Sequence, residues 1–323
     1  MTRTLGFLAA LVLAFPGTGL HAQAYPTKAV KIVSAYPAGI TPDVAARLVA
    51  ERLSKAWGQP VILEPRPGGN GFIAIGAAKK AAADGYELLL VGNAHLTINP
   101  HIFKSIPYDP ESDFVPVSLI YRAPFFVVVA SDGPYRTVQD LVAAAKAAPE
   151  RITYSTPYVG SPPHIGGAML AALTDTKMQA VHFKEGPQMY TSVANGDISF
   201  SVATSGSVTP LMKAGKIKLL AIAAPARLAS QPDVPTMKEA GGPAGYEVES
   251  WVGFVALRGT PAEVVRKIGA DIATALADAD LKERYRNLGI EPVGSSSAQM
   301  LDLIRSDLKR TGEIVKRAGI QPE

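Results

Sequence analysis

The sequence contains no cysteine among its 323 residues. This absence excludes disulfide bonds, a thiolate nucleophile, a cysteine-ligated metal site and a lipid anchor attached to cysteine. Histidine is scarce as well, with five copies, and no pair of them has the spacing of metal ligands on one helix face. We therefore expect neither a metal site nor a cofactor.

Catalytic and nucleotide-binding signatures are also missing. The chain has no G-x-S-x-G nucleophile elbow, and the glycine-rich turn at 66–71 does not match G-x-x-x-x-G-K-[ST] or G-x-G-x-x-G. We interpret that turn mainly as a connection before a helix, and we assign no catalytic residue.

Long apolar runs are absent except at the N-terminus, where the stretch from Leu5 to Phe15 is too short to span a bilayer comfortably. Arg3 precedes this stretch, and Ala22-Gln23-Ala24 follows it with the small-x-small pattern of a cleavage site. The pattern predicts a secretory signal peptide over 1–24, cleaved near Ala24, and an exported mature chain.

An excess of charge of either sign is lacking too. The formal net charge is +4, and removal of the signal takes away only the charge of Arg3, leaving +3. So small and dispersed a charge excludes a nucleic-acid surface and is compatible with an anionic small ligand. Hydrophobic residues make up 47% of the chain and charged residues 19%, which indicates a substantial core.

Strand-like and helix-like patterns alternate along the chain, which predicts an α/β fold with largely parallel sheets flanked by helices. The length allows two domains. The expected strands are 30–33, 60–64, 88–92, 114–120, 125–130, 152–155, 179–182, 198–203, 219–223 and 249–256, and the expected helices are 44–57, 72–82, 138–147, 162–173, 188–195, 261–277, 279–288 and 297–318.

A loop of small residues, 35–40, connects the first strand to the first helix. We expect Thr41 to be the N-cap and Pro42 the first helical residue, while Gly39 allows a tight turn before the cap. Free N–H groups and the positive end of the helix dipole would then meet at one anion-binding loop. The alternative is an ordinary strand-to-helix turn.

A second loop, 156–161, repeats this arrangement in the second half of the chain. Ser161 is the expected N-cap, Pro162 the first helical residue, and Gly160 lies just before the cap. Two such units could present two anion-binding loops to one shared cleft.

Several other residues near strand ends have both a binding and a purely structural interpretation. His95, preceded by Asn93, and His164 could bond a ligand or only cap the backbone. Asp43 could interact with the helix dipole, hold a loop amide or bind a ligand ammonium. Lys184 could pair with a ligand carboxylate or be a solvated lysine, and Tyr158 could line the cleft or belong to the core.

Motifs spread over the whole mature chain resemble the Bug (TctC-like) family of periplasmic solute receptors of tripartite tricarboxylate transporters. Each motif is weak alone, but their order and spacing are specific. They include Tyr36-Pro37-Ala38-Gly39, Glu64-Pro65-Arg66-Pro67-Gly68-Gly69-Asn70-Gly71, Asp84-Gly85-Tyr86, Pro107-Tyr108-Asp109-Pro110, Ser161-Pro162-Pro163-His164, Asn195-Gly196-Asp197 and Pro232-Asp233-Val234-Pro235-Thr236.

The resemblance implies a two-domain flytrap fold, with a first domain at 25–126 and 250–323 and a second at 127–249. It implies that a carboxylate is bound by the loop after the first strand, partly through water, and by the helix start of the second domain, and that the protein lies in the periplasm. The expected ligand-binding residues are Tyr36, Pro37, Ala38, Gly39, Ile40, Thr41, Asp43, Asn93, His95, Tyr158, Gly160, Ser161, His164, Lys184 and Ser205.

Three departures from the family pattern bear on the ligand. Ile40 stands where many relatives carry a second glycine, Phe183 stands in place of a tyrosine, and residues 202–206 lack a common asparagine. The apolar and aromatic side chains of Ile40, Tyr158 and Phe183 suggest that the ligand is a more apolar or aromatic acid, a class that includes dicarboxylates.

The resulting hypothesis is a monomeric binding protein, without cofactor, that captures an organic acid and passes it to a membrane permease. One rival is an exported hydrolase or lyase, which would need a nucleophile with a base, or a metal. Another is a sensor subunit for a membrane kinase, which would share the ligand and differ in its partner.

Overall fold

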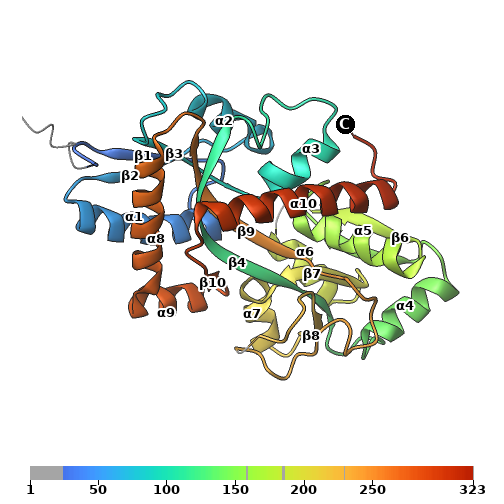
Figure 1. Ribbon diagram of the computed structural model, residues 1–323. Helices are drawn as coiled ribbons and strands as arrows, with labels where there is room; N and C mark the ends of the chain where they lie inside the picture. Colours follow the sequence, from blue (N-terminus) through green and yellow to red (C-terminus); the bar gives the residue numbers. More distant parts are fainter. Residues whose placement is uncertain (1–24, 158, 184–185, 229, 323) are drawn as a thin grey trace, which may run out of the picture.

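The computed structural model describes residues 25–157, 159–183, 186–228 and 230–322. The chain forms two α/β lobes that share one long strand (Figure 1). We call the part built on the strand order β2-β1-β3-β9-β4 the first lobe, and the part built on β4-β7-β5-β6 the second lobe.

The first lobe contains most of the N-terminal third and the C-terminal quarter of the chain. Its strands are β1 (Val30–Ser34), β2 (Val61–Pro65), β3 (Glu87–Gly92), β9 (Glu249–Leu257) and β10 (Glu291–Pro292). Its helices are α1 (Thr41–Trp57), α2 (Phe72–Ala78), α3 (Asn99–Ile102), α8 (Ala262–Ala277), α9 (Ala279–Asn287) and α10 (Ser297–Arg317), with the short segments η1 (Gly69–Gly71) and η2 (Ala94–Ile98).

Alternation along the strands gives this lobe two buried faces. Ile32 and Leu90 point to the core under α1 and α8, while Val33 and Leu89 point to the core under α2 and the first half of α10. Successive side chains of a strand point to opposite faces, so a sheet covered on both sides needs continuous apolar strands.

The second lobe is built on the middle of the chain. Its strands are β5 (Ile152–Thr156), β6 (Met178–His182), β7 (Phe200–Thr204) and β8 (Ile217–Ile222), and its helices are α4 (Val138–Ala147), α5 (Pro162–Thr174), α6 (Gly186–Ala194) and α7 (Ser205–Lys213). We did not predict α7, because its Ser-Gly-Ser-Val-Thr-Pro sequence has a poor intrinsic helix propensity.

One strand, β4 (Phe114–Ala130), connects the lobes, and our expectation of two separate strands here was wrong. Its first part, through Pro124, pairs with β9, and from Phe125 on it pairs with β7 and β8. Proline lacks an N–H group and is typical of a strand end, so Pro124 indicated a break between the two expected strands. In the structure, Pro124 lies where β4 changes its pairing partner from β9 to β7 and β8.

The α/β prediction is confirmed, although the sheets are mixed to a greater degree than "largely parallel". The strands β2, β1 and β3 are parallel, as are β6, β5 and β7. Every pairing of β4 and β9 is antiparallel, because these two strands run back and forth between the lobes.

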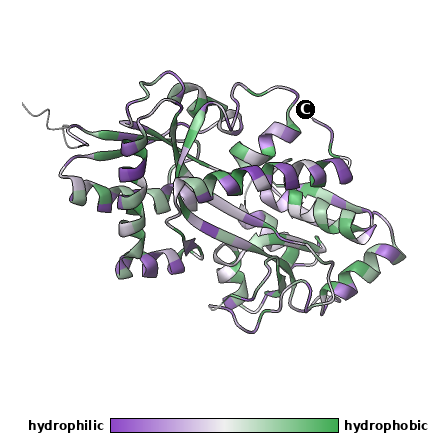
Figure 2. Cartoon of the chain, in the orientation of Figure 1, coloured by the Kyte–Doolittle hydropathy of each residue, from purple (hydrophilic) through white to green (hydrophobic). Residues whose placement is uncertain are grey.

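Alternate residues of β4 also supply both faces of the second lobe. Phe125 and Val127 contact the core with α4 and α5, and Phe126 and Val128 contact the core with α6 and α7. Figure 2 shows the strands largely green, with purple residues gathered on outer helices such as α9. The domain bounds at 126/127 and 249/250 stay a prediction.

The long helix α10 crosses from the first lobe to the second (Figure 1). Ile304, in its first half, is buried in the first lobe. Val315, near its end, contacts a small apolar cluster with Ile98 and Ile102 of the first lobe and Ile165 of α5. This helix therefore holds the two lobes together along one side.

Candidate functional site

The carboxyl ends of the parallel strands lead into the loops that carry most of the predicted site residues. In the first lobe, β1 leads into residues 35–40 and β3 leads into Asn93 and His95. In the second lobe, β5 leads into the loop before Ser161. Ligands of α/β proteins commonly bind at these strand ends, which makes the two loops the first place to look for a site.

The first loop turns within a few residues after β1. The hydroxyl of Ser34 accepts a hydrogen bond from the amide of Tyr36 at 3.1 Å. Gly39 has a φ of +82°, a conformation that favours glycine. Most of the loop faces solvent, including the four residues Pro37, Ala38, Gly39 and Ile40, and the Ile40 side chain is 42% exposed.

The start of α1 differs from the prediction. Ile40, not Thr41, occupies the N-cap position, and Thr41 and Pro42 form the first helical positions. Isoleucine cannot cap a helix through its side chain. Instead Asp43, in the first turn, accepts the amide hydrogen of Gly39 on its Oδ2 atom at 2.9 Å. The aspartate thus reaches back past the N-cap residue to the amide before it and closes the loop.

Asp43 is held on its other side by Arg47. The Arg47 Nε atom lies 3.0 Å from Asp43 Oδ2, and a terminal guanidinium nitrogen donates to Oδ1 at 3.1 Å. Asp43 is buried, with 1% of its surface exposed, whereas the Arg47 side chain is 48% exposed. Of the three interpretations of Asp43, the structure supports two: it lies in the first turn of α1, at the positive end of the helix dipole, and it holds a loop amide.

A π-helical turn, η2, begins directly after Asn93, and we did not predict it. Asn93 donates from Nδ2 to the Glu249 carbonyl oxygen at 2.9 Å, and its own carbonyl accepts the Thr97 hydroxyl at 3.0 Å. π-Helical turns are rare and are frequent at functional sites. The sequence offers no signal for one here, because Ala-His-Leu-Thr-Ile is compatible with an ordinary helix.

His95 lies at the centre of this turn and is fully involved in local packing. Its Nδ1 atom accepts the Gly92 amide at 3.3 Å, so in the neutral ring Nε2 carries the proton. The ring meets the Tyr36 ring edge-on with 5.0 Å between centroids. It also fills the space where a Cβ atom of Gly71 would stand. Burial lowers the pKa of His95 to about 4.

The second loop forms as predicted. Ser161 is the N-cap of α5, and its Oγ atom accepts the His164 amide at 3.3 Å, with Pro162 at the first helical position. The Thr156 hydroxyl lies 2.8 Å from the Ser161 hydroxyl. The Nδ1 atom of His164 accepts the Gly160 amide at 3.2 Å, which fixes the turn before the helix.

The two histidines therefore have equivalent roles in the two lobes. Each accepts a loop amide on Nδ1. Burial, and secondly the nearby His182, lowers the pKa of His164 to about 4. Both rings are neutral at neutral pH, which leaves each with an Nε2–H donor and no positive charge. The capping interpretation of both histidines is thus confirmed for Nδ1.

The two lobes touch at the second loop. A Cβ atom on Gly160 would lie 2.0 Å from Cδ1 of Ile102 in the first lobe, and the φ of Gly160 is +80°. A small pocket at this contact is lined by His95 and Asn70 of the first lobe and by Val159 and Gly160 of the second. The structure thus brings His95 and Gly160, two predicted site residues, together across the lobes.

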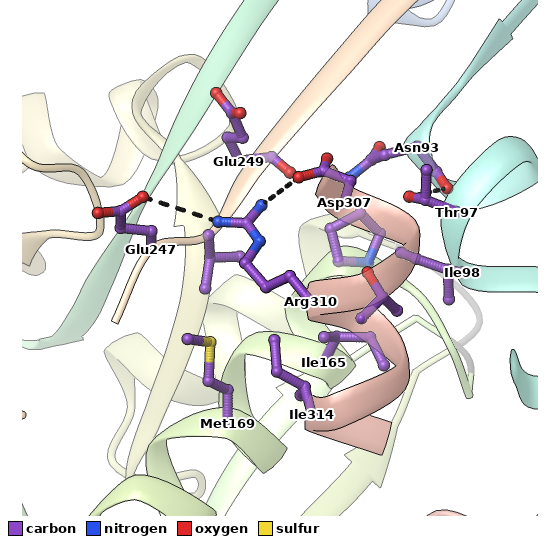
Figure 3. Close-up of a pocket in the computed structure, with 13 residues that line it drawn as sticks. Asn93, Thr97, Ile98, Ile165, Met169, Glu247, Glu249, Asp307, Arg310 and Ile314 are labelled. Atoms are coloured by element: carbon purple, nitrogen blue, oxygen red, sulfur yellow. Dashed lines mark hydrogen bonds and ion pairs between the residues drawn. The ribbon is translucent and has the colours of Figure 1, made fainter. Parts of the chain in front are cut away.

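A neighbouring pocket between the lobes contains Asn93 (Figure 3). Arg310 of α10 lies 2.8 Å from Asp307 and 3.7 Å from Glu247. Burial raises the pKa of Glu249. The remaining wall is apolar and includes Ile165, Met169 and Ile314. Sequence reasoning missed this pocket, because Asp307 and Arg310 have the spacing of an ordinary pair on a helix surface.

Ser205 is not joined to these loops by the described contacts: it begins α7 and lines a separate pocket with Pro124 and Gly289. Tyr158 and Lys184 lie outside the described residues.

Within the described ranges, no three histidine or acidic side chains gather in a way that could hold a metal ion. The same part of the chain contains no helix with the length and apolar character that a membrane crossing requires.

Comparison with known families gives one match over most of the chain. Residues 45–320 match the model of the tripartite tricarboxylate transporter family receptor, TctC. A UPF0065 protein of Bordetella bronchiseptica is 34% identical over 322 residues, which cover 100% of this chain and 95% of that protein.

Two solved structures from Rhodopseudomonas palustris are also similar. Rpa4515, solved with adipate, is 32% identical with a TM-score of 0.81, and the match covers 93% of this chain and 100% of that one. MatC, solved with malate, is 26% identical with a TM-score of 0.76, covering 90% of this chain and 100% of that one. These likenesses confirm the predicted resemblance and fold class.

The contact at Gly160 predicts a specific cost of adding one methyl group. In Gly160→Ala, the left-handed backbone should cost about 1–2 kcal/mol and overpacking against buried Ile102 about 1–3 kcal/mol more. Gly196→Ala is the matched control, because Gly196 has a φ of +82° with open space around it. Urea unfolding should show the larger loss for Gly160→Ala; equal losses would mean that the lobes do not press together here.

The buried His95 predicts a loss of stability in acid. Its folded pKa of about 4 lies below the ordinary 6.5, so between these values the unfolded chain takes up a proton that the folded chain does not. Stability should therefore fall as the pH drops through this window, by on the order of 3 kcal/mol from His95. Urea unfolding of His95→Asn, which retains an acceptor, should show a shallower decline. Parallel curves for the two proteins would contradict the assignment.

Proposed function

Because this chain belongs to the tripartite tricarboxylate transporter receptor family, we propose that it captures a small organic acid between its lobes and delivers it to the membrane permease of such a transporter. The family consists of periplasmic receptors. We infer that residues 1–24 direct export, that cleavage occurs near Ala24, and that the mature protein acts as a monomer.

One observation carries the proposal: the second loop, at the start of α5, meets the segment that follows β3 in the first lobe, and His95 of that segment packs against Tyr36 of the first loop. Gly160 of the second loop and His95 beside the first loop line the same small pocket. A carboxylate near this place would meet the Nε2–H donor of neutral His95 and the positive N-terminal end of α5. The ligand-binding set is proposed to include Tyr36, Gly39, Thr41, His95, Gly160, Ser161 and His164.

The ligands in related structures support the class of acid. Rpa4515 was solved with adipate and MatC with malate, both dicarboxylates. A dicarboxylate suits a site with one anion-binding loop in each lobe, because each carboxylate can engage one loop. Ile40, exposed beside the first loop, is proposed to favour a ligand with an apolar middle section over a short hydroxy acid.

The two lobes close over the ligand because the ligand contacts both of them. A ligand that touches both loops stabilises the state in which they are near each other, because the open state offers it only one. A micromolar dissociation constant corresponds to about −8 kcal/mol. Charge-assisted hydrogen bonds of roughly 1.5–3 kcal/mol each supply this after the cost of association.

Calorimetry with adipate, malate, terephthalate and hexanoate tests the proposal. At least one dicarboxylate should bind with a dissociation constant of about micromolar, and it should raise the thermal midpoint with increasing concentration. Hexanediamide, the neutral counterpart of adipate, is the control and should bind at least about a hundredfold more weakly. Failure of every acid to bind, or equal binding of the diamide, would contradict the proposal.

A further inference from the structure

A negative charge of the protein's own lies directly after the first loop, at the place where an acid is proposed to bind. The Asp43 carboxylate lies in the first turn of α1 and accepts the Gly39 amide hydrogen at 2.9 Å. The positive end of the α1 dipole therefore faces the protein's own carboxylate before it faces any ligand. A loop prepared in this way is well ordered, but it offers an incoming anion less attraction than an empty helix start.

Arg47 is the cation that offsets this charge among the described residues. It binds both Asp43 oxygens, through Nε to Oδ2 at 3.0 Å and through a terminal nitrogen to Oδ1 at 3.1 Å. This bidentate arrangement is the strong form of a carboxylate–guanidinium pair. Because Asp43 is 1% exposed, water screens its charge poorly, and the neutralisation depends on Arg47.

We propose that Arg47 is a positioning residue that acts through Asp43: by neutralising this buried carboxylate, it permits a second, ligand carboxylate to bind at the first loop. This inference rests on the proposed function and assigns the charge balance of that site. Asp43 holds the loop in shape, and Arg47 makes the loop acceptable to an anion. Neither side chain is required to touch the ligand.

A merely structural role predicts a different pattern of variants. If the pair only holds the loop in shape, removing both partners should weaken adipate binding at least as much as removing one. If Arg47 offsets a charge, the weaker binding in Arg47→Met comes from the uncompensated Asp43 carboxylate. Adding Asp43→Asn should then restore adipate binding, because asparagine keeps an acceptor for the Gly39 amide without the charge.

Adipate binding by calorimetry on the full mature protein separates these cases. Arg47→Met should weaken adipate binding about tenfold or more, and the double variant Asp43→Asn/Arg47→Met should return to within about threefold of the wild type. Lys55→Met is the matched control: Lys55 pairs with Glu51 at the same spacing on α1, but both are exposed. It should leave the affinity unchanged. A double variant that binds as weakly as Arg47→Met overturns the proposal.

Urea unfolding without ligand provides an independent reading. Arg47→Met should lower the free energy of unfolding, and the double variant should regain most of the loss. If the wild type binds none of the acids, the proposed function fails, and unfolding alone decides the charge assignment. Equal losses in the single and double variants would then overturn it, and recovery in the double variant would support it.

Discussion

The antiparallel pairing of β4 with β9 is the constraint on which the rest of the molecule depends. β9 pairs with β4 from Phe114 to Pro124, and β4 then continues into the second lobe, where it pairs with β7 and β8. Both lobes are therefore built on one continuous strand. Helix α10 adds a second connection, because its end contacts Ile165 of the second lobe.

The sequence predicted the features that local chemistry determines. Ser161 followed by two prolines specifies a capped helix start, and the structure has one. Thr41 followed by Pro42 looked equivalent, yet α1 begins one residue earlier, with Ile40 at the N-cap, and the Asp43 side chain accepts the Gly39 amide in place of any side-chain cap. The continuity of β4 and the π-helical turn at Ala94–Ile98 depend on tertiary pairing and packing, for which the sequence carries no local signal.

The two loops show a common principle, in which a nearby side chain accepts one of the loop's own backbone amides. In the first loop Asp43 takes up the Gly39 amide, and in the second the His164 ring takes up the Gly160 amide. Loops fixed in this way lose little conformational entropy on binding, so more of the contact energy appears as affinity. The same arrangement limits which donors stay available, and it underlies the role that we propose for the charge on Arg47 at the first loop.

The central claim is that an acid binds by bridging the two lobes, and an interlobe distance measurement tests it most directly. The chain has no cysteine, so Arg266→Cys on α8 and Lys146→Cys on α4, both exposed, allow two spin labels to be placed without background. Electron–electron resonance should show that saturating adipate shifts the distance distribution and narrows it to one population. Adipate binding that is measurable by calorimetry but leaves the distribution unchanged would contradict the claim.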